Sequence, residues 1–165
     1  MGDTSRFSQS HGIVYETIIV DDNYDGGVSM DSLNMGKYNH GTLIIIGDVV
    51  CAGAGVVTMM AGLTNGAETA AITFTERHTL TDVGSTTADV LTAPATSAAL
   101  ALTEAYIRSG MYVIEWDAQD MVVAGVQYNW MTPVLSNAGT AGMVAAIAIL
   151  SEPRYEKEVM PTAVA

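Results

Sequence analysis

The last third of the chain contains three apolar runs, MYVIEWD (Met111–Asp117), QYNWMTPVLS (Gln127–Ser136) and MVAAIAIL (Met143–Leu150). Each run has the length and the residue types of a β-strand, and Gly, Asn, Asp or Pro residues bound it. Pro133 has no N–H group, so the second run is expected to lie at a sheet edge or to be broken there. Pro153 is expected to end the third strand. Together the runs predict a layered β-structure.

More strands are expected upstream of these runs. The continuous apolar run Leu43–Ile46 predicts a central strand that is buried on both faces. The pair Asn65-Gly66 favours a hairpin between the segments on either side of it. The strand segments expected here are Ile13–Val20, Thr42–Val50, Val56–Leu63 and Ala70–Glu76.

Two later segments have a weaker pattern. Residues 77–99 are rich in Thr, Ser and Ala and are expected to cross the surface as a long loop. Leu100–Arg108 is expected to form a short helix or another strand. The chain of 165 residues has a size typical of one domain. The resulting prediction is an all-β fold, a β-sandwich or jelly-roll-like body at 13–155, with an extended N-terminal arm at 1–12 and a C-terminal tail at 156–165.

The charge of the chain argues against several classes of partner. Eighteen acidic and six scattered basic residues give a net charge of -12. Binding to nucleic acid requires clustered cations that neutralise phosphates, so no nucleic-acid partner is expected. Anionic membrane surfaces are disfavoured for the same reason, and the longest apolar runs are too short to cross a bilayer. The polar N-terminus does not resemble a signal peptide, so synthesis in the cytoplasm of the cell that expresses the chain is expected.

One short motif resembles a calcium-binding loop. Asp21, Asn23, Asp25 and Gly26 match its opening, in which alternate oxygen ligands surround a glycine turn. The twelfth position is Ser32, where the motif requires a bidentate carboxylate. An acidic turn is therefore the favoured interpretation, with Asp21, Asn23 and Asp25 kept only as a weak metal candidate and no cofactor expected.

No set of residues suggests catalysis. His11, His40 and His78 lack the spacing of a metal site. Glu115 and Asp117 share one face of a strand, where a solvated strand end is the expected explanation. Cys51 is the only cysteine and is expected to be a small buried apolar residue. Because no nucleophile, base and orienting group can be named together, no catalytic residue and no enzyme activity are expected.

The order of the segments between Gly41 and Tyr155 resembles a group of small structural proteins encoded in tailed-bacteriophage genomes, often near the major capsid gene. An apolar strand leads through a Gly/Ala-rich turn to a second strand, and three characteristic segments follow. The matching segments are Thr42–Val50, Val56–Met60, AAITFTE (Ala70–Glu76), YVIEWDA (Tyr112–Ala118) and ILSEPRY (Ile149–Tyr155).

This resemblance implies a virion protein that decorates and stabilises the outer surface of the capsid as a cement protein. It implies the major capsid protein as partner and a homo-trimer or another symmetric oligomer. The interface candidates are Tyr15, Trp116, Trp130, Arg154 and Tyr155.

Two other functions remain open from the sequence. The chain could be a structural subunit of the tail or neck, as a tube or head-completion protein. It could also be a calcium-dependent carbohydrate-binding β-module that uses the loop at 21–25 and the aromatic residues Tyr24 and Tyr38, which this hypothesis requires to be exposed.

Overall fold

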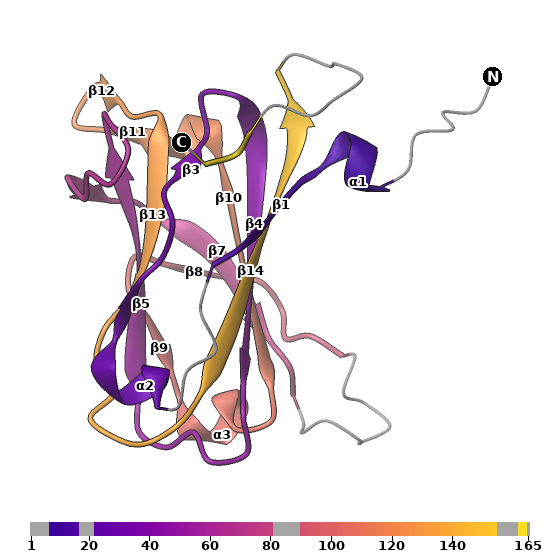
Figure 1. The fold of residues 1–165 in the computed structure, drawn as a ribbon, viewed down its shortest axis with the longest axis vertical. Coiled ribbons are helices and arrows are strands. Elements are labelled where there is room, and N and C mark those ends of the chain that lie inside the picture. Colours follow the sequence, from indigo (N-terminus) through magenta and orange to yellow (C-terminus); the bar gives the residue numbers. More distant parts are fainter. Residues whose placement is uncertain (1–6, 17–21, 81–89, 155–161, 165) are drawn as a thin grey trace.

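The computed structural model describes residues 7–16, 22–80, 90–154 and 162–164. Most of its strands form two sheets, here called sheet A and sheet B, that face each other across a hydrophobic core (Figure 1). The prediction of an all-β sandwich is therefore confirmed. In Figure 1 the sheets are seen almost edge-on, with β5 and β13 of sheet B on the left and β4, β10 and β14 of sheet A on the right.

Sheet A has β4 near its centre, between β14 and β10, as the apolar run 43–46 predicted. All its neighbouring strands are antiparallel. In spatial order the strands are β1 (Gly12–Tyr15), β14 (Val144–Pro153), β4 (Tyr38–Gly47), β10 (Met111–Asp117), β7 (Phe74–His78) and β8 (Ala95–Ser97).

The prediction that this central strand is buried on both faces is wrong. Leu43 and Ile45 are buried in the core, whereas Ile44 is only half-buried and Ile46 is exposed. Successive side chains of a strand point to opposite faces, and the described part of the chain places no second layer over the outer face. The apolar run therefore supplies the core and also an open apolar surface.

Sheet B contains the second of the C-terminal runs. The run at 127–136 is divided, because Gln127 ends one short strand and β13 begins at Trp130. The strands of sheet B are β2 (Val28–Ser29), β13 (Trp130–Leu135), β5 (Gly55–Gly62) and β6 (Ala70–Ala71), with β3 (Leu33–Asn34) paired to β13 and β9 (Leu100–Leu102) paired to β5.

Pro133 neither breaks β13 nor places it at an edge, contrary to the sequence prediction. The strand pairs with β5 on one side and with β2 and β3 on the other. On the second side, β2 and β3 are separated by a gap, and Pro133 lies opposite this gap. The Met30 N–H donates to the Pro133 carbonyl across this interruption at 3.0 Å. Since the N and O of one residue point to the same side in an antiparallel strand, the missing N–H faces the gap and leaves the ladder with β5 intact.

The hairpin at Asn65-Gly66 forms, with Gly66 at φ 75°, but only two residues of its second arm pair with β5. After β6 the chain crosses to sheet A as β7. The segment at 77–99 is not a loop throughout, because it holds the end of β7, a bridge between Thr79 and Leu91, and β8. Residues 81–89 lie outside the described chain.

The remaining short elements connect the two sheets. The segment at 100–108 contains both of the expected structures, β9 followed by a single helical turn. The third C-terminal run extends beyond Leu150, so that β14 ends at Pro153 itself. The short elements are α1 (Phe7–Ser10), α2 (Asn23–Gly26), α3 (Glu104–Ile107), η1 (Ala118–Met121), β11 (Val122–Val123) and β12 (Val126–Gln127), the last two forming a separate hairpin.

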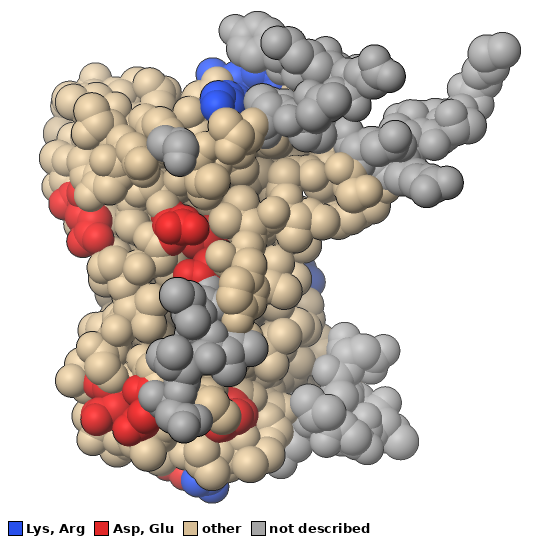
Figure 2. Space-filling model, viewed as in Figure 1, with Lys and Arg blue, Asp and Glu red and all other residues tan. Residues whose placement is uncertain are grey.

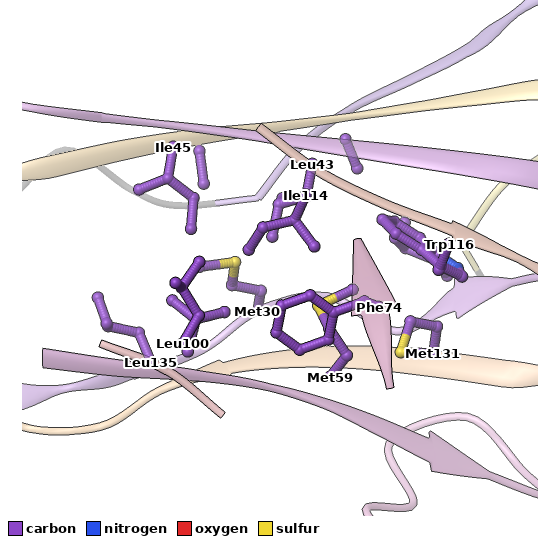
Figure 3. Packing of buried hydrophobic residues seen from close by; sticks show 14 of the residues in the cluster. Met30, Leu43, Ile45, Met59, Phe74, Leu100, Ile114, Trp116, Met131 and Leu135 are labelled. Atoms are coloured by element: carbon purple, nitrogen blue, oxygen red, sulfur yellow. The ribbon is translucent and has the colours of Figure 1, made fainter. Parts of the chain in front are cut away.

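The core consists mainly of the inward-facing side chains of both sheets, together with residues of the connecting segments such as Tyr24, Ile107 and Met121. Figure 3 shows residues from sheet A pointing toward Met59, Met131 and Leu135 of sheet B. Trp116 is the largest fully enclosed side chain, and its indole lies directly over Gly41 on the adjacent strand. The sheet A residues labelled in this view are Leu43, Ile45, Phe74, Ile114 and Trp116.

The two ends of the chain are only partly described. The strand expected at 13–20 is observed as β1, and residues 17–21 are outside the described part. Within the arm expected at 1–12, α1 projects from the body on the side of sheet A (Figure 1). Of the tail expected at 156–165, only 162–164 are described, and the Asn34 N–H donates to the carbonyl of Ala163 at 2.8 Å. No helix in the described ranges has the length and hydropathy needed to span a membrane.

Candidate functional site

The outer face of sheet A carries a continuous apolar surface. Strand register brings its residues together, because directly paired residues of antiparallel strands lie on the same face. Ile149 pairs with Ile13, and Ile147 pairs with both Tyr15 and Ile44. We call this surface the outer patch and define it by Ile13, Tyr15, Ile44, Ile46, Ile147 and Ile149.

The residues at the ends of the outer patch are exposed to solvent, and those at its centre are half-buried. Ile13 is 55% exposed, Tyr15 51% and Ile46 43%, while the other members are half-buried by their strand neighbours. Met111 and Val113 of β10 pair with Ile46 and Ile44 and extend the apolar surface across a fourth strand. A contiguous apolar surface of this kind on a folded protein is typical of a binding surface.

A polar cluster limits the outer patch at one end. His40 Nδ1 lies 2.7 Å from an Asp117 oxygen, and His40 Nε2 lies 3.9 Å from an oxygen of Glu115. These two carboxylates were predicted to share one strand face, and the structure places His40 beside both of them. The cluster is half-exposed and lies on the same face as the patch, where it forms a polar rim next to an apolar centre.

The five interface candidates lie in different places. Tyr15 belongs to the outer patch. Trp116 is 2% exposed and is a core residue, so it is not available to a partner as an interface anchor. Trp130 is half-buried on the outer face of sheet B. Arg154 is exposed and donates from Nε to Asn39 Oδ1 at 3.0 Å, and Tyr155 lies outside the described residues.

Arg154 also borders an open polar cavity of about 450 Å³ at the end of β4 and β14. Side-chain amides and carboxylates of both strands and of the β11–β12 region line it. The residues around it are Asn39, Asp117, Ala118, Gln119, Gln127, Glu152 and Arg154.

The described residues of the weak calcium candidate do not form a metal site. Asn23 is buried, and its side-chain amide donates to the Val144 carbonyl and accepts from the Val144 N–H, both at 2.8 Å. Asp22 Oδ1 accepts from the Gly142 N–H at 2.9 Å, so this turn holds the start of β14 in place. Asp25 is half-buried, and Asp21 lies outside the described chain. Within the described ranges, no group of three or more metal-binding side chains comes together.

The aromatic residues of the carbohydrate-binding hypothesis are not exposed, contrary to its requirement. Tyr24 and Tyr38 are both completely buried in the core. The Tyr24 hydroxyl donates to the Leu102 carbonyl at 3.0 Å and accepts from the Gly55 N–H at 2.9 Å. Burial raises the pKa of both phenols. They therefore cannot form a platform on which a sugar ring could stack.

Cys51 and Glu16 are buried titratable groups. Cys51 is buried as expected, its thiol donates to the Met143 carbonyl at 3.2 Å, and burial raises its pKa to about 11. Glu16 is only 5% exposed, and burial together with the negative charge of Asp31 raises the pKa of its carboxyl group to about 8. Neither Glu16 oxygen forms a hydrogen bond with the described residues.

The outer patch was not predicted from the sequence, because residues 43–46 were expected to form a strand buried on both faces. A signal was available in the run at 143–150. In that run Ala146 and Ala148 alternate with Ile147 and Ile149, and the structure places the small residues inside and the large ones outside. Large aliphatic residues on the face opposite the core side indicate an open apolar surface.

Comparison with known proteins gives little further information. No family model matches the chain, and no curated protein matches it. Among solved structures, the fold is similar to the crystal structure of the SPBc2 prophage-derived protein YomS. The TM-score is 0.48 with 12% sequence identity, over 84% of this chain and 92% of that chain.

Proposed function

We propose that this protein is a non-catalytic structural subunit of a bacteriophage particle, which binds the outer surface of the capsid together with sister copies. The observation that carries a binding role is the outer patch, an apolar sheet face on a body whose core is already filled from both sheets. The placement in a phage particle comes from the resemblance of segments 41–155 to virion structural proteins.

Charge and architecture support this role. A net charge of -12 keeps the protein from competing for the packaged genome, because acidic surfaces repel phosphates. A two-sheet body is stiff along its strands, and its flat faces can be covered by other proteins without rearrangement of the backbone. A decoration subunit requires these properties and needs no catalytic group.

Counting the protein in purified phage particles tests the proposal. Quantitative mass spectrometry of gradient-purified particles, with the major capsid protein as internal standard, gives the number of copies. A role on the capsid predicts on the order of hundreds of copies, because the shell repeats its symmetric units many times. Absence of the chain from particles contradicts a virion role.

The tail or neck remains the competing location, and the same measurement separates it from the shell. A ring around the portal or tail holds roughly six to twelve copies, as expected for a cyclic assembly. Binding of the purified protein to emptied, undecorated shells, followed by co-sedimentation, provides an independent check. A shell-binding protein sediments with the shells in a saturable manner, whereas a neck subunit stays in the supernatant.

A further inference from the structure

We propose that a second copy of this chain covers the outer face of sheet A, so that two sheets A pack face to face. This proposal rests on the binding role proposed above and names the occupant of the outer patch.

The centre of the face has the composition of an interface core. Ile44 and Ile147 are directly paired, and Val113 lies beside Ile44 on the next strand. The six residues of the patch include no charged side chain, and five of them are isoleucine. Depletion of charge at the centre with a polar rim around it is the usual anatomy of protein–protein interfaces.

The size of the face suits a second sheet of equal extent. Each residue of a sheet covers roughly 16 Å², since strands lie about 4.8 Å apart and rise about 3.3 Å per residue. The strands from β1 to β7 therefore present on the order of 600 Å² of surface, near the roughly 800 Å² per partner of a standard interface. Packing of one sheet on another in this way also forms the cores of β-sandwiches.

The distribution of charge explains how two acidic molecules can meet on this face. The carboxylates of the face, Glu115 and Asp117, lie together at one end, and Met111 and Ile46 lie at the other end. Arg77 of β7 lies between these ends, beside Val113. A two-fold axis parallel to the sheets and perpendicular to the strands places the acidic end of one copy over the uncharged end of its mate. The two acidic clusters are then separated by the length of the strands, and repulsion between them is small.

One side of the outer patch lies at the edge of sheet A. Ile13 and Tyr15 belong to β1, an edge strand of sheet A. Phe7 of α1 is also exposed, and α1 projects from the body on the side of sheet A in Figure 1. An edge strand with exposed apolar residues and no lysine or proline is open to further association. A mate that covers sheet A also shields these groups from water.

Sedimentation velocity of the purified full-length chain, with substitutions at exposed positions, tests the proposal. The variants Ile13→Lys and Ile46→Lys change opposite ends of the patch. The controls Leu63→Lys and Val122→Lys change residues that are equally exposed elsewhere, 58% and 51%, so all four should fold. At about 50 μM the wild type and both controls are expected as dimers or larger oligomers, with self-association of the patch variants weakened at least about tenfold.

A chemical cross-link locates the contact. Cys51 is buried, so an introduced Ile147→Cys at the patch centre is the reactive thiol, and Val122→Cys is its control. A short bis-maleimide is expected to join two copies through position 147 and not through position 122. A monomeric wild type, equal effects of all four lysine variants, or cross-linking at 122 alone overturns the proposal.

The outcomes also separate this inference from the proposed function. The protein could be monomeric in solution and still be present in on the order of hundreds of copies per particle. That result means that another virion protein covers the outer patch. In that case the inference fails and the virion role stands. An oligomer held by the patch but absent from particles leaves the inference intact and contradicts the virion role.

Discussion

At the scale of single residues, Glu16 is the least expected feature of the chain. Its carboxyl group is buried, and its pKa of about 8 lies far above the usual value of 4.5. Burial is the larger cause, because a charged carboxylate loses its hydration, and the negative charge of Asp31 adds to it. The Asp31 N–H offsets part of the rise but lies outside hydrogen-bond geometry. Glu16 is therefore protonated in the folded protein near neutral pH.

This raised pKa predicts a loss of stability as pH increases. Between pH 4.5 and about 8 the unfolded chain releases the Glu16 proton while the folded chain keeps it, so the folded state binds more protons. The free energy of unfolding should fall across this window, by at most roughly 1.4 kcal/mol per pH unit from this group. Glu16→Gln removes this contribution and should flatten the dependence, as measured by urea denaturation at several pH values.

The control is Glu104→Gln, which changes an exposed carboxylate paired with Arg108 at 3.1 Å. It should leave the slope almost unchanged, because an exposed pair contributes little to stability. A slope in Glu16→Gln equal to that of the wild type would show that the Glu16 carboxyl group is hydrated in the folded protein.

At the scale of elements, the contact between β4 and β10 depends on one glycine. Gly41 and Trp116 are directly paired, and a Cβ atom on Gly41 would overlap the indole ring. Gly41→Ala is therefore expected to reduce the free energy of unfolding by roughly 1–3 kcal/mol, as overpacked cores do. Thermal or urea denaturation followed by circular dichroism measures the change.

Gly26→Ala is the matched control for this substitution. A Cβ atom at Gly26 meets no heavy atom within 4 Å, and its backbone is not in the left-handed region. The control should be neutral or slightly stabilising, by up to about 1 kcal/mol. Equal destabilisation by both substitutions would mean that contact with Trp116 does not decide the result.

The sequence predicts the long strands of this fold and loses accuracy where tertiary context decides. Met111–Asp117 is observed with its predicted bounds, since its alternation is complete within the run. Pro133 was misjudged because its tolerance depends on a gap between β2 and β3, which lie about a hundred residues earlier in the chain. Short strands such as β8 have no pattern of their own and exist only through pairing with β7.

The candidate site was predictable only in part. Tyr15 was named as an interface residue and lies in the outer patch, but Ile44 and Ile46 were assigned to the core. A run of aliphatic residues specifies a strand, and only the number of layers in the fold determines whether one or both faces are covered. The number of layers depends on the complete topology and cannot be predicted from the local periodicity of apolar residues.

At the scale of the whole molecule, charge and apolar surface have opposite effects on self-association. The net charge of -12 opposes association of identical copies, and the outer patch favours it. Figure 2 shows Asp and Glu scattered over the body, with Lys and Arg mainly near the top and bottom of the view. Lys37 and Arg154 are neighbours, because the Arg154 N–H donates to the Lys37 carbonyl, and neither belongs to the outer patch.

This balance predicts how salt affects self-association. Raising NaCl from about 20 mM to about 500 mM shortens the screening length and weakens the repulsion between copies, while apolar contacts remain. The dissociation constant of the wild-type oligomer should therefore decrease severalfold, as measured by sedimentation at a series of salt concentrations. A dissociation constant that increases with salt would indicate an interface held by ion pairs instead of by the outer patch.

The positions of the two tryptophans have a practical consequence. Trp116 is enclosed in the core, Trp130 is half-buried on the outer face of sheet B, and neither belongs to the outer patch. The intrinsic fluorescence of the chain should shift to longer wavelength when the core opens to solvent. The same emission should change little when copies join through sheet A, so a spectrum recorded during dilution distinguishes subunit separation from denaturation without any added dye.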